Sequence, residues 1–141
     1  YDQSATNTIF VEGITDYCYL TAFKIFHKID NIVFLPIQGV KKPGIVDTLL
    51  KVEKLPTILV DGDQAGIAFK EKNGNRKNVE IFTLADIDKN WKTIEDLFSA
   101  EDKQKTKYFN DCVSFKNKLS ASKVSKETKD NFKKLLENIA V

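Results

Sequence analysis

Residues 58–66 read ILVDGDQAG, and this stretch decides how the rest of the chain is expected to fold. Its apolar, β-branched start is typical of a buried strand over 57–61, and the Asp and Gly residues that follow are typical of a turn. A second segment has the same form, because FVEGITD at residues 10–16 follows a β-branched and aromatic run over 8–12. A buried strand, a turn and a helical pattern in succession favour a parallel sheet.

The chain alternates strand and helix signals as far as residue 84. We expect strands at 8–12, 33–37, 57–61 and 79–84, and helices between them beginning near Thr15 as N-cap, over 45–55 and over 65–72. The first helix carries an apolar stripe of Tyr19, Leu20, Phe23, Phe26 and Ile29, and the second one of Ile45, Leu49, Val52 and Leu55. This order predicts an α/β fold: a Rossmann-like parallel sheet with right-handed crossovers and helices on both faces.

The last part of the chain has a different pattern. Residues 101–141 read as helix throughout, with a Lys-rich stretch through Leu119, a polar break at 120–122 and a final helix capped by Ser125. We therefore divide the chain into an α/β core over 1–100 and a C-terminal helical extension over 101–141.

Composition indicates one globular domain, since 42% of the 141 residues are hydrophobic and only six are Gly and three Pro. No apolar run approaches the roughly 18 to 20 residues that span a bilayer. No secretory leader is visible, so a cytoplasmic location and no membrane partner are expected. Because the chain lacks Met and starts at Tyr1, we expect it to be a piece of a longer protein.

Charge and cysteine content narrow the chemistry. Residues 1–100 hold 12 basic and 14 acidic side chains, whereas residues 101–141 hold 10 basic and 6 acidic ones. The basic residues of 101–141 can be explained as the solvated face of a helical end. If the acidic residues of 1–100 hold metal, a polyanionic partner becomes the favoured explanation. Cys18 and Cys112 lie far apart without zinc-site spacing, so we expect both to be reduced thiols.

Acidic residues follow the predicted strands, at the edge where parallel sheets bind their ligands. They are Glu12 and Asp16 after the first strand, Asp61 and Asp63 after the third, and Asp86, Asp88, Glu95 and Asp96 after the fourth. Carboxylates that converge on one rim repel one another unless a proton or cation neutralises them, and hard oxygen ligands suit Mg²⁺ or Mn²⁺. Turn chemistry alone explains the Asp-Gly-Asp sequence equally well, but Glu12 on a second strand favours a site.

The segments FVEGITD and ILVDGDQAG resemble the two signature motifs of the Toprim domain, the metal-binding α/β module of topoisomerases, primases and certain nucleases. The resemblance covers residues 7–100. Within that superfamily the chain is similar to nucleases of the OLD (overcoming lysogenization defect) family, including those of retron and Gabija-type phage defence. VEGITDYCYL, FLPIQGVKK, IEDLF and SKETKDNFKKLLENI carry this similarity.

The resemblance implies a Toprim-like fold and a metal-dependent endonuclease that cleaves or nicks DNA with two Mg²⁺ or Mn²⁺ ions. It implies a ligand set of Glu12, Asp16, Asp61, Asp63, Glu95 and Asp96, with Glu12 also acting as a general acid or base through water. A lysine after the core would offset transition-state charge, and Lys116 is our candidate with Lys118 behind it, although a solvated tail explains both. Lys41 and Lys42 could meet phosphate, or could simply belong to a solvated turn.

Partners follow from the same resemblance: DNA, an ATPase domain of the same parent chain whose Walker A sequence is absent here, defence-complex partners and a second copy of the chain. Two alternatives stay open. A bacterial primase also shows Glu-Gly-x-x-Asp and DGDxAG motifs, which implies nucleotidyl transfer. The chain could instead be a non-catalytic module that binds metal weakly and serves as an assembly surface.

Overall fold

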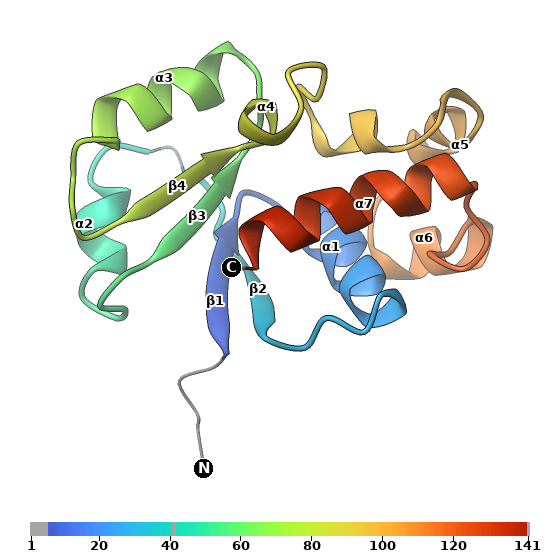
Figure 1. Ribbon diagram of the computed structural model, residues 1–141, viewed down its shortest axis with the longest axis horizontal. Coiled ribbons are helices and arrows are strands. Elements are labelled where there is room, and N and C mark those ends of the chain that lie inside the picture. Colours follow the sequence, from blue (N-terminus) through green and yellow to red (C-terminus); the bar gives the residue numbers. More distant parts are fainter. Residues whose placement is uncertain (1–5, 41, 141) are drawn as a thin grey trace.

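A computed structural model describes residues 6–40 and 42–140, and four parallel strands form its centre. The strands are β1 (Asn7–Val11), β2 (Ile32–Pro36), β3 (Thr57–Val60) and β4 (Glu80–Thr83), in the order β2-β1-β3-β4 (Figure 1). Each lies within about one residue of its predicted position, because a short apolar run that ends at turn residues marks both ends of each strand in the sequence. The predicted α/β, Rossmann-like fold is confirmed.

Helices cover both faces of the sheet (Figure 1). In β1, Ile9 and Val11 point into a core that α1 (Ile14–Phe26) and α7 (Lys126–Ile139) complete, whereas Phe10 points into a second core with α2 (Ile45–Leu49) and α3 (Gln64–Asn73). Successive residues of a strand face opposite sides, so a strand buried on both faces is apolar throughout.

The remaining short helices connect the sheet to α7. They are α4 (Leu84–Ile87), the 3₁₀ helix η2 (Ile94–Leu97), α5 (Ala100–Thr106) and α6 (Cys112–Lys118). Apolar residues of this part belong to the same core as β1, and the rings of Phe23 and Phe132 stack with centroids 3.9 Å apart. The boundary at residue 100 stays a prediction, while the core runs across it.

Hydrogen bonds fasten the start of α7 to η2 and α5. The buried Thr128 hydroxyl donates to Asp102 at 2.7 Å and accepts from the Ser99 N–H, and the Asn131 side chain donates to the Leu97 carbonyl at 2.9 Å. Burial by itself raises the pKa of Asp102, but the hydrogen bonds from Ser125 and Thr128 outweigh it and hold that pKa below its ordinary value. The buried charge is therefore well solvated by the protein.

Three sequence expectations about helices are wrong. The N-cap of the first helix is Gly13 rather than Thr15, and the Asp16 side chain in the first turn accepts from the Gly13 N–H. The second helix ends at Leu49, which leaves Val52 and Leu55 73% and 57% exposed. Pro56 disfavours helical backbone at Leu55, so the predicted helix could not extend to that residue.

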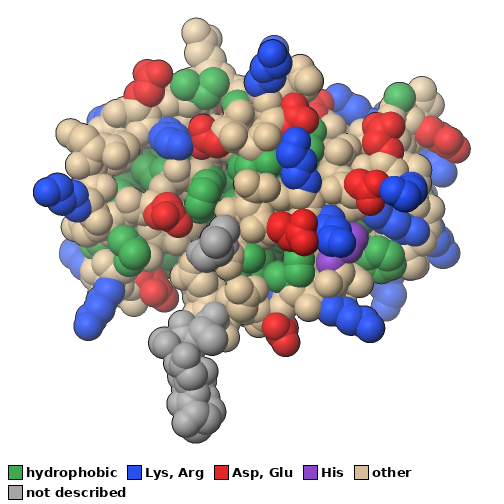
Figure 2. Space-filling view, viewed as in Figure 1, with side chains coloured by type: hydrophobic (Ala, Val, Ile, Leu, Met, Phe, Trp, Pro, Cys, Tyr) green, Lys and Arg blue, Asp and Glu red, His purple; other side chains and the backbone are tan. Residues whose placement is uncertain are grey.

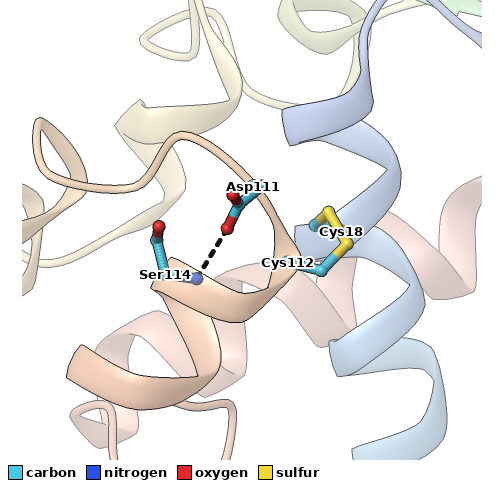
Figure 3. The surroundings of a disulfide bond; sticks show 4 residues. All are labelled: Cys18, Asp111, Cys112 and Ser114. Carbon is cyan, nitrogen blue, oxygen red and sulfur yellow. Dashed lines mark hydrogen bonds between the residues drawn. A yellow bond between two sulfur atoms is a disulfide. The ribbon is translucent and has the colours of Figure 1, made fainter.

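The Lys-rich stretch through Leu119 is two helices rather than one. A new N-terminus forms where the Asp111 carboxylate accepts from the Ser114 N–H at 2.7 Å, which starts α6 (Figure 3). The break over 120–122 and the Ser125 cap of α7 are as expected. In the described part of the chain no helix has both the length and the apolar character that crossing a bilayer requires.

Cys18 and Cys112 form a disulfide, which corrects the expectation of reduced thiols (Figure 3). Cys18 lies in the second turn of α1 and Cys112 is the first residue of α6, and their Cα atoms are 5.1 Å apart. The 94-residue separation hid this pairing, because only the packing of α6 against α1 brings the two residues together.

This disulfide should stabilise the domain. Closing so long a loop restricts the unfolded chain, so the Cys112→Ser variant should lose about 2–4 kcal/mol of unfolding free energy. Urea unfolding with and without a dithiol reductant measures the effect, and the Cys18→Ser/Cys112→Ser double variant should be insensitive to reductant. Equal unfolding free energies for the oxidised and reduced protein would contradict the prediction.

Candidate metal centre

Two acidic residues leave adjacent strands at the same edge of the sheet. Glu12 follows β1 and Asp61 follows β3, and Val11 lies opposite Leu59 in the parallel register. The ends of these strands are neighbours, so the two carboxylates begin close together without any contribution from loop conformation. The sequence expectation that both sit on one edge of the molecule is confirmed for this pair.

Glu12, Asp16 and Asp61 line one small hollow, here called the carboxylate hollow. Its volume is about 10 Å³, which is room for about one water-sized group. Apolar side chains form the rest of its wall: Val11, Leu20, Leu59, Val60, Leu84 and Ile94. Three acidic groups thus open onto a space that is otherwise apolar, where their charges are poorly screened.

Asp16 shows how strongly these charges act on one another. Burial and the nearby charges of Asp61, Glu95 and Glu12 raise the pKa of Asp16 to about 7, although the Gly13 N–H opposes this by donating to its Oδ2 at 3.2 Å. Glu95, in the first turn of η2, does not line the hollow but lies near enough for its charge to be felt. Three predicted ligands therefore act electrostatically on a fourth, Asp16.

The chemistry of this set fits a hard divalent cation. Carboxylate oxygens are the ligands that Mg²⁺ and Mn²⁺ prefer, and a cation would offset both the burial and the repulsion that raise the pKa of Asp16. Within residues 6–40 and 42–140, no three Asp, Glu, His or Cys side chains are already grouped tightly enough to enclose an ion. Glu12, Asp16, Asp61 and Glu95 are the residues that would hold one.

Two glycines of the DGDQAG motif allow this edge to pack. The Gly62 N–H donates to the Lys92 carbonyl at 2.8 Å, and a Cβ at Gly62 would overlap the Trp91 carbonyl oxygen. A Cβ at Gly66, in the first turn of α3, would overlap the Asp61 carbonyl oxygen. These positions exclude a side chain because other backbone approaches them closely, whatever their φ angles.

Asp63 and Asp96 have structural partners. Asp63 caps α3 by accepting from the Gly66 N–H at 2.8 Å. Asp96 accepts from the backbone N–H groups of Lys92 and Thr93 and pairs with Lys103. Burial raises the pKa of Asp96, but these contacts outweigh it and lower that pKa overall. As metal ligands both residues stay predictions, and Asp96 would have to give up an ion pair.

Lys116 lies elsewhere. It lines a groove between α1 and α6 of about 550 Å³, together with Tyr17, Cys18, Ala22 and Phe115, and it is not among the residues of the carboxylate hollow. Lys116 and Lys118 are exposed on α6, while Lys41 lies outside the described residues. The structure therefore does not bring the predicted transition-state lysine to the predicted ligands.

The sequence analysis missed one residue near the site. Tyr19 is fully buried, and its hydroxyl has no hydrogen-bond partner among the described residues. Burial and the charges of Glu95 and Asp16 raise the pKa of Tyr19 well above its ordinary range. Its position in an apolar helical stripe indicates a core residue. Its place one turn after Asp16 is the sequence signal that it lies on the same side of the helix as a predicted metal ligand.

The surface shows no single-sign field on the face drawn in Figure 2. Basic and acidic side chains are interspersed there, with small apolar areas between them. Lys134 illustrates this mixing, since its ammonium lies 3.7 Å from Asp88 and 5.5 Å from the centroid of the Trp91 ring. The surplus of positive charge in residues 101–141 is thus partly balanced by the body on which it packs.

No protein-family model, no curated protein and no solved structure matches this chain.

The close approach at Gly62 can be tested by adding one methyl group. Gly62→Ala should cost about 1–3 kcal/mol of unfolding free energy or more, because backbone rather than a flexible side chain blocks the new atom. Gly13→Ala is the matched control, because Gly13 occupies the corresponding place after the neighbouring strand β1. Its new Cβ would meet only the Asp16 carboxylate, at 3.7 Å. Chemical unfolding compares the two, and equal losses would contradict the packing described here.

Asp16 should make the metal-free protein less stable as pH rises. Its pKa of about 7 in the folded state exceeds the ordinary 3.8, so the folded state binds more protons between those values and stability falls through that window. At pH 8 in EDTA, Asp16→Asn should therefore be more stable than wild type by on the order of 1–3 kcal/mol. At pH 4 the two should be nearly equal.

Unfolding free energies measured at several pH values test this difference. The exposed Asp30, in the loop between α1 and β2, provides the control variant Asp30→Asn, which should not reproduce it. A gain from Asp16→Asn that is independent of pH would contradict a raised pKa of Asp16.

Proposed function

We propose that this chain is a metal-dependent nuclease domain of the Toprim type, as in OLD-family nucleases, and that it cleaves or nicks DNA. The observation that carries the proposal is the convergence of Glu12, Asp16 and Asp61 on one apolar-walled hollow. Burial of Asp16 and its repulsion by the neighbouring carboxylates disfavour the folded state at neutral pH in the absence of a cation. An arrangement that lowers stability in this way is typical of a functional site.

Bound Mg²⁺ or Mn²⁺ ions would supply Lewis-acid stabilisation of phosphate charge and an activated water. The chain's own residues have distinct parts in this proposal. Glu12 and Asp61 hold fixed positions because they continue two hydrogen-bonded strands, and Asp16 is oriented by the first turn of α1. Glu12 also has the acid–base chemistry to hold a proton of the attacking water.

The hydrophobic wall has a part as well. Leu20, Leu84 and Ile94 keep the surroundings of the carboxylates apolar, so that a cation and a phosphate attract each other more strongly than in water. The positive charge of residues 101–141 supports DNA as the substrate, although Lys116 is placed in the groove rather than at the hollow. An ATPase domain and a second copy of the chain belong to the proposal as partners.

A partner-binding module is the second candidate, and the groove between α1 and α6 favours it. Ile25 and Val113, on these two helices, are 66% and 65% exposed, and the lining of the groove is largely apolar. Exposed apolar area of this kind is typical of interaction surfaces. The two candidates are compatible, since the groove and the hollow are lined by different residues.

The proposal predicts that purified protein cleaves supercoiled plasmid or linear single-stranded DNA in Mg²⁺ or Mn²⁺ and not in EDTA. Asp61→Asn and Glu12→Gln should each lower the cleavage rate at least about 100-fold, because each removes a charge that the cation needs. Asp30→Asn removes the same charge from the exposed loop between α1 and β2 and should keep the wild-type rate.

Other outcomes separate the alternatives. Cleavage that persists in EDTA and in Asp61→Asn would rule out this site as the nuclease centre. Calorimetric Mn²⁺ binding without cleavage would favour the partner-binding module. Metal-dependent incorporation of nucleoside triphosphates would favour primase-like nucleotidyl transfer.

A further inference from the structure

One side chain in the core has a polar atom that the fold does not use. Tyr19 is fully buried and its hydroxyl has no hydrogen-bond partner among the described residues. An unsatisfied buried hydroxyl costs about 1–3 kcal/mol. The rings around it are all Phe, at centroid distances of 5.1 Å for Phe98 and Phe115 and 6.2 Å for Phe109. Phenylalanine at position 19 would satisfy this packing without the cost.

The position of Tyr19 ties it to the candidate metal centre. It follows Asp16 by one turn of α1, and residues three apart lie on the same side of a helix. Its ring packs edge-on against Phe98, which follows Glu95 by three residues at the end of η2. Tyr19 therefore lies between the two elements that carry Asp16 and Glu95.

Electrostatics agree with this placement. After burial, the charge of Glu95 is the largest influence that raises the pKa of Tyr19, and the charge of Asp16 follows. The phenol consequently stays protonated at neutral pH, so its O–H is available to donate to an acceptor. The carboxylates whose charges act on Tyr19 are acceptors of this kind.

Resting on the function proposed above, we propose that Tyr19 is a positioning residue of the metal centre, whose buried hydroxyl donates a hydrogen bond to the Glu95 carboxylate when a divalent cation is bound. Groups behind metal ligands commonly orient them in this way. The hydroxyl would thus be unsatisfied only in the metal-free protein.

Glu95 is a better acceptor for this bond than Asp16. Asp16 Oδ2 already accepts from the Gly13 N–H, and Asp16 lines the hollow directly. Glu95 stands outside the set of lining residues, so it must turn inward to contact a cation there. A donor fixed in the core beside it would hold one carboxylate oxygen and leave the other for the metal.

The inference predicts opposite effects on folding and on metal binding. In EDTA, Tyr19→Phe should be as stable as wild type or more stable, because it removes an unsatisfied hydroxyl. Its affinity for Mn²⁺ should fall about 10-fold or more, as is usual when a group behind the ligands is lost. Tyr17→Phe is the matched control, since Tyr17 is on the same helix but lines the groove instead of the hollow.

Calorimetric titration of the whole chain with MnCl₂, urea unfolding in EDTA and DNA cleavage would be measured on wild type, Tyr19→Phe, Tyr17→Phe, Glu95→Gln and Tyr19→Phe/Glu95→Gln. If Tyr19 acts through Glu95, the double variant should bind Mn²⁺ no more weakly than Glu95→Gln alone. Cleavage by Tyr19→Phe should recover at Mn²⁺ concentrations raised by the same factor as the loss of affinity.

Each other result overturns the inference in a recognisable way. Unchanged Mn²⁺ affinity in Tyr19→Phe overturns it, while wild-type binding and cleavage leave the nuclease proposal standing. Loss of stability in EDTA with unchanged affinity shows a purely structural hydroxyl. Additive losses in the double variant show that Tyr19 does not act through Glu95. Absence of Mn²⁺ binding by wild type overturns the proposed metal centre itself.

Discussion

The contact between Gly62 and the backbone of residues 91–92 is the constraint on which the carboxyl edge of the sheet depends. The Gly62 N–H donates to the Lys92 carbonyl, and no side chain fits between the loop after β3 and this segment. Asp96 holds the same segment from its other side by accepting from Lys92 and Thr93. Asp61 and Glu95 reach the site from the two chain segments joined by this contact, so their separation is set by backbone rather than by flexible loops.

Two partly or fully buried carboxylates show how differently one fold can treat the same group. Asp102 lies among donors from Ser125 and Thr128, and its pKa falls despite burial. Asp16 has one backbone donor and several carboxylate neighbours, and its pKa rises to about 7. The first arrangement stabilises the fold and the second opposes it. Asp16 in the carboxylate hollow therefore differs from Asp102 in that its charged form makes the folded state less stable.

The strands and the adjacency of Glu12 and Asp61 could be predicted because both follow from local patterns. A run such as TILV is apolar on both faces, and parallel strands bring their carboxyl ends together without further information. The second helix was predicted too long because Val52 and Leu55 continue the helical spacing of apolar residues beyond Leu49, where the helix ends.

Other features depended on packing between distant segments. Neither the Cys18–Cys112 disulfide nor the place of Lys116 can be read from spacing, since both depend on how α6 lies against α1. A role for Tyr19 could not be predicted for a different reason. Its ring fits the apolar stripe of the first helix, which by itself explains a buried tyrosine.

The attachment of η2 to α7 has a consequence for the order of events during synthesis. Asn131 and Thr128 of α7 bind the Leu97 carbonyl and the Ser99 N–H, and Phe132 stacks on Phe23 of α1. A ribosome makes the chain from its amino end, so every carboxylate of the hollow is translated well before these anchors. The nascent chain can pair its strands early, but Glu95 gains its final support only after α7 emerges from the exit tunnel.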